Sequence, residues 1–341
     1  MISEQSAESS QRLVDLRRNR SFFLGGIMDK PFKTYRQQLG ILRKRNMIIN
    51  DGSKAIKILK RENYYNIING YKDIFIDKNA TTDEKFKTGT KFEHVYALYE
   101  FDRNLRGIFL KYILKLESVM KSKISYFFSE KYKASFNYFN TSNFDNNNLA
   151  EVTKLITRIS STIEQNTKNK NGQICHYLNN YQNLPLWVLM KKLDFGGTSY
   201  FYSVLETLLK DRICREILED YKREYSLNTI LTNDSAQLGK ILFFVNKFRN
   251  ACAHDERLYN LNVRNNKKIK FQHFYNPSIV NKYNLFDLLV VLKIFLLKKD
   301  FKRLSKSLER EFDNLSQEIP SNIFNLVQIE MGFSKTWATT I

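Results

Sequence analysis

Proline and glycine are scarce in this chain, with four and twelve respectively among 341 residues. Sandwiches and barrels of β-strands need many tight turns, which these two residues commonly supply. Their scarcity disfavours such folds, and no alternation of strand and helix patterns points to a parallel sheet. The sequence therefore predicts an all-α protein. Hydrophobic residues make up 43% of the chain, enough for a sizeable core.

Cysteine and histidine are also rare. Three cysteines are far apart and form no CxxC pair: Cys175, Cys214 and Cys252. We interpret them as reduced thiols of a cytoplasmic protein. Three of the four histidines, His94, His176 and His273, stand alone and are interpreted as ordinary surface or core residues. Neither a Walker loop, nor a GxGxxG turn, nor an HExxH motif is present, so we expect no metal and no cofactor.

Long apolar runs are missing as well. The longest, "NLFDLLVVLKIFLLKK", is interrupted by Asp287 and Lys293 and is too short to span a bilayer comfortably. It predicts a buried helix. The N-terminal residues lack the continuous apolar segment of a secretory signal.

Positive charge is abundant. Lysine and arginine total 55 against 35 acidic residues, a formal net charge of +20. This excess predicts a polyanionic partner, either nucleic acid or an anionic membrane surface. No basic amphipathic anchor stands out, so RNA is the expected partner and no membrane contact is expected.

The chain divides into three parts by pattern. Residues 1–29 are expected to be a flexible leader, residues 30–90 a basic N-terminal helical segment with a linker, and residues 91–341 the main helical domain. Thr34 is a plausible N-cap for the first helix of the basic segment. The cations of this segment are either a solvated face or RNA contacts: Lys33, Arg36, Arg43, Lys44, Arg45, Lys57, Lys60 and Arg61.

The main domain opens with a long amphipathic pattern, "FEHVYALYEFDRNLRGIFLKYILKLESVMKSKISYFFSEKY". Its apolar residues repeat every 3.6 positions over several turns and predict one long helix. Glu117 lies near the apolar stripe, where its carboxylate is either exposed at the edge or paired with a buried cation.

Further helices are expected at residues 149–165, after Pro185, from Asp234 or Ser235, and in "NLFDLLVVLKIFLLKK" and "FKRLSKSLEREFDNL". The pair Gly196–Gly197 is expected to break or cap the helix that follows Pro185. A short extended piece is expected at "KIKFQHF", and a short tail after the last helix.

One stretch carries the candidate chemistry: "NKFRNACAHDERLYN". On a helix, Asn246, Asn250 and His254 share a face, Arg257 extends it, and the long side chain of Arg249 can swing beside the imidazole. Histidine exchanges a proton near neutral pH and guanidinium binds phosphate oxygens, a combination that suits RNA cleavage by the 2′-hydroxyl without a metal. On spacing alone, the alternative is that these residues form a polar helix face that carries no catalytic chemistry.

This stretch resembles the Arg-x4-to-6-His motif of the HEPN superfamily. Blocks on either side resemble, in the same order, the bacterial abortive-infection family that contains the AbiD and AbiF proteins: "KPFKTYRQQLGILRKRNMII", "NYYNIINGY", "LPLWVLMKKLDFGGTS" and "MGFSKTW" among them. The likeness runs from Lys30 to the C-terminus.

The resemblance implies a HEPN-type helical bundle and a metal-independent endoribonuclease of phage defence or a toxin–antitoxin system, related to the HEPN nucleases of RNA-targeting CRISPR effectors. It assigns Arg249, Asn250 and His254 as the catalytic set. Asp255 and Arg257 are supporting candidates, and Glu117 is a candidate partner for a motif arginine.

The chain shows one such motif, so the resemblance also implies a homodimer with a composite site, and it suggests a small non-coding RNA as regulator. Because the superfamily includes non-catalytic members, the alternative is an RNA-binding protein that forms a ribonucleoprotein with a small RNA.

Overall fold

The computed structural model describes residues 31–80, 84–228, 231–263, 269 and 283–340. Within these residues the secondary structure is helical, and β pairing is limited to two isolated bridges, Ile48 with Lys91 and Ile76 with Phe86. The predicted all-α class is confirmed. The expected extended piece "KIKFQHF" and His273 lie outside the described residues, apart from Ile269. Among the residues described, no helix is both long enough and apolar enough to cross a membrane.

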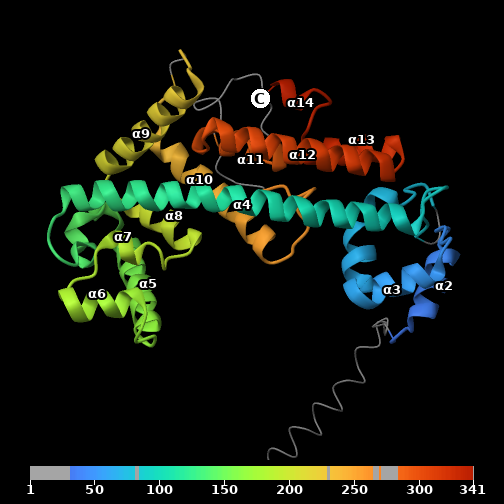
Figure 1. Ribbon diagram of the computed structural model, residues 1–341, viewed down its shortest axis with the longest axis horizontal. Helices are drawn as coiled ribbons and strands as arrows, with labels where there is room; N and C mark the ends of the chain where they lie inside the picture. Colours follow the sequence, from blue (N-terminus) through green and yellow to red (C-terminus); the bar gives the residue numbers. More distant parts are fainter. Residues whose placement is uncertain (1–30, 81–83, 229–230, 264–268, 270–282, 341) are drawn as a thin grey trace, which may run out of the picture.

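The forty-residue helix α4 (Phe92–Lys131) is the axis of the molecule. At 1.5 Å per residue it is about 60 Å long, and it runs across the whole width of Figure 1. The predicted long helix is confirmed. Helices α7 (Leu186–Leu189), α8 (Phe195–Val204) and α9 (Thr207–Tyr225) contact it, as do α10 (Ser235–Ala253), α11 (Leu285–Phe295) and α12 (Lys298–Glu318).

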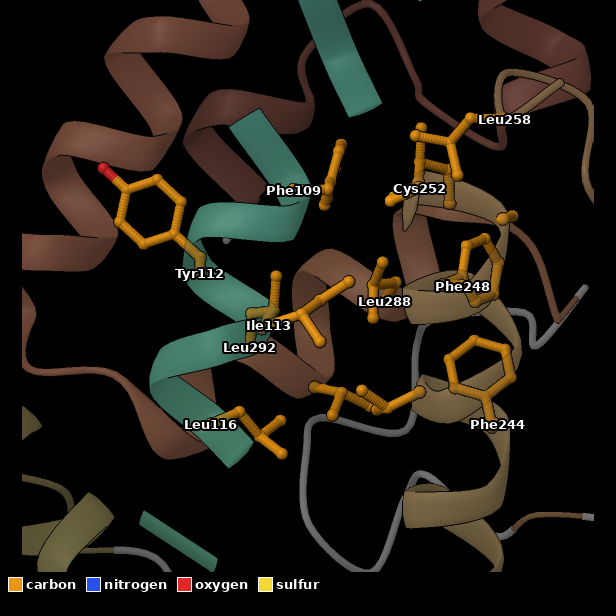
Figure 2. Packing of buried hydrophobic residues seen from close by; sticks show 14 of the residues in the cluster. Phe109, Tyr112, Ile113, Leu116, Phe244, Phe248, Cys252, Leu258, Leu288 and Leu292 are labelled. Atoms are coloured by element: carbon orange, nitrogen blue, oxygen red, sulfur yellow. The ribbon is translucent and has the colours of Figure 1, made fainter. Parts of the chain in front are cut away.

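The core that positions the end of α10 lies between α4, α10 and α11 (Figure 2). The side chains at its centre are almost fully buried: Phe109, Ile113 and Leu116 from α4, Phe244 and Phe248 from α10, and Leu288 and Leu292 from α11. Each such side chain stabilises the fold by roughly 1.5–3 kcal/mol relative to exposure. Asp234 caps α10 by accepting the N–H of Gln237 at 3.0 Å, as the sequence predicts.

The basic N-terminal segment packs against the beginning of α4. It contains α2 (Tyr35–Lys44), α3 (Gly52–Glu62), a π-helical turn (Tyr65–Asn69) and a 3-10 turn (Asp73–Phe75). Thr34 caps α2 in a capping box with Gln37, which confirms the predicted N-cap. The N–H of Ile48 donates to the Thr90 carbonyl, and the N–H of Phe92 donates to the Ile48 carbonyl. The apolar residues of this segment belong to the same hydrophobic cluster as those of the main helices.

Helices α5 (Leu149–Thr167), α6 (Gln173–Tyr181), α7 and α8 gather at the C-terminal end of α4, below it in Figure 1. The sequence analysis expected Gly196 and Gly197 to end the helix after Pro185. They form the first turn of the next helix, α8. The carboxylate of Asp194 caps α8 by accepting the Gly197 N–H at 2.7 Å. A Cβ at Gly197 would lie 3.1 Å from the Nε of Arg158, so this turn leaves little room for any side chain.

The chain after α12 is also more helical than expected. The segment interpreted as a short tail contains α13 (Ser321–Met331) and α14 (Trp337–Thr340). Trp337 is buried against Phe312 and Phe333. The tail is therefore part of the core and covers α12.

Candidate active site at the end of helix α10

The predicted motif residues lie at the C-terminal end of α10. Arg249 and Asn250 are half-buried in its last turn, and His254 is the exposed C-cap residue. The backbone N–H of His254 donates to the Asn250 carbonyl at 2.9 Å. The polar stripe expected along Asn246, Asn250 and His254 is thus formed, with the imidazole at its end.

The helix stops here because the next residue has left-handed backbone geometry. Asp255 has a φ of 58°, a conformation that aspartate tolerates better than most side chains. The N–H of Glu256 then donates back to the Ala251 carbonyl at 3.0 Å, which closes the helix end.

This ending overturns one expectation. Arg257 does not extend the stripe, because the chain has already left the helix at Asp255. Its Nη1 donates to the Gly70 carbonyl at 2.6 Å and lies 3.1 Å from a carboxylate oxygen of Asp73. Arg257 therefore ties the chain beyond the motif to the N-terminal segment.

A buried polar network fixes the residues that follow His254. Asp102 of α4 is 0% exposed, and its carboxylate accepts the backbone N–H groups of Leu258 (2.9 Å) and Tyr259 (2.6 Å). Arg106, one turn later and 4% exposed, donates from Nη1 to Asp102 at 2.8 Å and from Nη2 to Asp255 at 2.5 Å. Two residues of α4 thus hold the turn on both sides of Glu256.

The hydroxyl of Tyr71 completes the network. It donates to Asp102 at 2.7 Å and accepts from Arg106 at 3.1 Å. Burial raises the pKa of Asp102, and the hydrogen bonds from Tyr71 and Leu258 and the charge of Arg106 oppose this rise. Because every member has a partner, this network is suited to holding the turn rigidly.

Of the three motif residues, only His254 is exposed, while Arg249 and Asn250 are half-buried. The Nε of Arg249 is buried and has no hydrogen-bond partner among the described residues. Cys252, between Arg249 and His254, offers no competing nucleophile, because burial raises the pKa of its thiol to about 12. A guanidinium and an exposed imidazole at the same helix end can bind a phosphate and move a proton.

Glu117 does not take the role expected of it. Its carboxylate pairs with Lys121, one turn later on α4, at 2.6 Å. Its Oε2 is buried and has no hydrogen-bond partner among the described residues. The expected pairing with a motif arginine is not formed, because Lys121 reaches this carboxylate from the same helix.

Comparison with protein families gives one match. A family model described as "Abi-like protein" matches residues 57–260, which is more than half of the chain. The chain belongs to the Abi-like protein family. Membership in this family points to abortive infection, a form of phage defence, as predicted from the resemblance. The match begins in α3 and ends just beyond the motif turn, so it includes α4 and α10. No curated protein and no solved structure matches the chain.

The N-terminal cations of this Abi-like protein are mostly unpaired. Among the eight cations predicted to contact RNA, Arg45 is the exception, since it pairs with Glu84 at 2.7 Å. The other seven predicted RNA contacts are exposed and form no ion pair with any described residue: Lys33, Arg36, Arg43, Lys44, Lys57, Lys60 and Arg61. They remain available to a polyanion.

A second basic surface of the Abi-like protein lies on α12. Five of its exposed cations fall within three turns: Lys298, Lys299, Lys302, Arg303 and Lys306. The stretch "FKRLSKSLEREFDNL" predicts a basic helix. It does not show which face of that helix is exposed. No group of three or more potential metal-ligating side chains gathers within the described part of the chain.

Proposed function

We propose that this Abi-like protein is a metal-independent endoribonuclease of the HEPN type. The observation that carries the proposal is the motif at the end of α10, where Arg249, Asn250 and His254 directly precede a turn held by Asp102 and Arg106. Such a site needs no cofactor. It fits a phage-defence protein that acts on RNA.

In the proposed reaction, an imidazole accepts the proton of a ribose 2′-hydroxyl, and the 2′-oxygen forms a bond to the adjacent phosphorus. The bond from phosphorus to the 5′-oxygen breaks, and a second imidazole supplies the proton for that leaving oxygen. The guanidinium of Arg249 stabilises the charge that grows on the phosphate, and the carboxamide of Asn250 orients the reacting groups. The products are a 2′,3′-cyclic phosphate and a 5′-hydroxyl.

A homodimer supplies the second imidazole, because the chain carries one such motif. The exposed face of α10 supports this proposal. Phe243, Lys247, Asn250 and His254 are spaced four, three and four residues apart and so share one face. Phe243 is 49% exposed on it. Two copies that pack along this face would bring their motif turns together.

The test is the chemistry of the product ends. Purified protein incubated with RNA and excess chelator is expected to give fragments with 2′,3′-cyclic phosphate and 5′-hydroxyl ends, at the rate found without chelator. Arg249→Ala protein purified in parallel controls for contaminating nucleases. Fragments with 5′-phosphate ends, or cleavage that the chelator stops, contradict the proposal.

The second candidate is an RNA-binding protein without catalysis, which forms a ribonucleoprotein with a small non-coding RNA. The seven unpaired cations near the N-terminus favour RNA binding in either case. This candidate predicts tight binding and no fragments in the same experiment.

The salt dependence of binding tests the RNA contact of the N-terminal segment. Replacing Lys57, Lys60 and Arg61 with glutamine is expected to lower the slope of log K against log salt by about 2 for single-stranded RNA, because each phosphate contact releases about 0.7 counterion. Fluorescence anisotropy measures binding between about 50 and 300 mM salt and gives this slope. Over this range the Debye length changes by about twofold.

The matched control removes three charges from α12 with Lys299, Lys302 and Lys306 changed to glutamine. This variant is expected to keep the wild-type slope. Equal losses in both variants would show nonspecific attraction to overall charge, and a loss confined to the α12 variant would contradict the assignment.

A further inference from the structure

An exposed tryptophan separates two hollows at the C-terminal end of α4. Trp187, in the short helix α7, is 55% exposed, and Tyr126 of α4 is 62% exposed. Both residues line the larger hollow, about 430 Å³, together with Ser122, Ser125, Ser129 and Glu130. The carboxylate of Glu130 pairs with Arg212 at 2.5 Å. Trp187 and Ser129 also line the smaller one, about 240 Å³. Trp187 is therefore a lining residue of two adjacent hollows.

Asn183 lines the smaller hollow and carries a buried acceptor without a donor. Its Oδ1 is shielded from solvent and has no hydrogen-bond partner among the described residues. An unsatisfied buried acceptor destabilises the free protein, and a donor on a bound ligand can recover that loss. Lys133 lies at the same hollow, is exposed and pairs with no described acid.

These groups match the parts of a nucleotide. A flat ring stacks on an exposed indole, an N–H on the edge of a base satisfies a carbonyl oxygen, and a lysine attracts a phosphate. Each hollow is at or below the usual size of a site for a drug-sized molecule, and so suits one ring system. In a duplex the bases are stacked on each other, so only single-stranded RNA can present them here.

We infer that this surface binds two neighbouring bases of single-stranded RNA, one in each hollow, with Trp187 stacked between them. Asn183 accepts a hydrogen bond from the base in the smaller hollow, and Lys133 pairs with a phosphate. The inference rests on RNA as the ligand of the proposed function, and it adds a site for holding the strand on α4 and α7, away from the motif turn on α10.

Tryptophan fluorescence tests this inference directly. The chain has two tryptophans, and the other, Trp337, is 5% exposed. Full-length His254→Ala protein is titrated with a short single-stranded RNA, with the same strand lacking its bases, and with an RNA duplex. The intact single strand is expected to quench most of the exposed tryptophan emission, and the other two ligands to leave it nearly unchanged.

Substitutions then measure the contribution of stacking. Trp187→Ala is expected to weaken binding of the single strand by at least about 30-fold, the lower end of the range for losing two stacked bases. Asn183→Leu is expected to weaken it by a smaller factor. Leu208→Ala removes an exposed side chain of α9, outside both hollows, and is expected to leave affinity unchanged. Circular dichroism confirms that each variant folds.

The outcomes separate the base-binding surface from the nuclease. Quenching and Trp187-dependent affinity without any cleavage by wild-type protein would support the surface and contradict the nuclease. Cleavage with unchanged affinity in Trp187→Ala would overturn the surface alone. Equal quenching by the abasic strand would also overturn the surface. So would a Trp187→Ala variant that changes only the oligomeric mass of the protein, because that result assigns the indole to a contact between protein chains.

Discussion

Replacing His254 with alanine is expected to lower the rate of RNA cleavage by about 10²- to 10⁴-fold, the range for losing a general acid or base. In the proposed reaction the imidazole transfers a proton, and it is exposed and has no hydrogen bond to any described residue. Alanine keeps the backbone N–H that donates to the Asn250 carbonyl, so the end of α10 remains intact. The loss should therefore fall on the reaction and leave the fold unchanged.

Initial rates on a fluorescent RNA and thermal midpoints of both proteins measure this effect. His176→Ala is the matched control, because it removes an exposed imidazole from α6, which packs on α5 and α7. It is expected to retain the wild-type rate. Equal activity of wild type and His254→Ala would remove His254 from the proposed site.

Mixtures of the two chains test the composite site. When wild-type and His254→Ala chains are co-expressed at known ratios, a site that needs both imidazoles gives activity proportional to the square of the wild-type fraction. A site completed within one chain gives a linear dependence. The linear result would contradict the dimeric site and leave the assignment of His254 intact.

Local patterns were sufficient to predict most of the fold. The apolar spacing of α4 and the caps at Thr34 and Asp234 depend on neighbouring residues, and the structure confirms them. Gly196 and Gly197 show where local rules fail. Glycine commonly ends a helix, but here the Asp194 cap starts one, and Arg158 from α5 approaches Gly197 closely enough to disfavour a larger side chain. That requirement comes from tertiary packing.

The candidate site was predictable only in its outer part. Arg249, Asn250 and His254 are close in sequence, so spacing and resemblance suggest them together. The network behind them is not visible in this way. Asp102 and Arg106 look like an exposed pair one helical turn apart, and Arg106 is 149 residues from its partner Asp255. Their burial follows from the packing of α4 against α10, which no local pattern specifies.

Replacing Asp102 with alanine is expected to lower the free energy of unfolding by about 3–5 kcal/mol, the usual effect of removing one partner of a buried ion pair. The change leaves the guanidinium of Arg106 buried without one of its carboxylates. It also leaves the backbone N–H groups of Leu258 and Tyr259 without an acceptor. Midpoints and slopes of urea unfolding measure the loss.

The control is Asp73→Ala, which removes the exposed partner of Arg257 and is expected to lower the free energy of unfolding by at most about 1 kcal/mol.

Asp102→Asn keeps one oxygen acceptor but no charge, so it should remain folded at low temperature while the turn after His254 loosens. Under those conditions its cleavage rate is expected to fall at saturating RNA, with little change in RNA affinity. A destabilised Asp102→Asn protein that cleaves at the wild-type rate would show that the network holds the fold without positioning His254. A reduced rate in folded protein would show that Asp102 helps to orient the imidazole of His254. This carboxylate contacts the motif through the backbone of the turn and through Arg106 and Asp255.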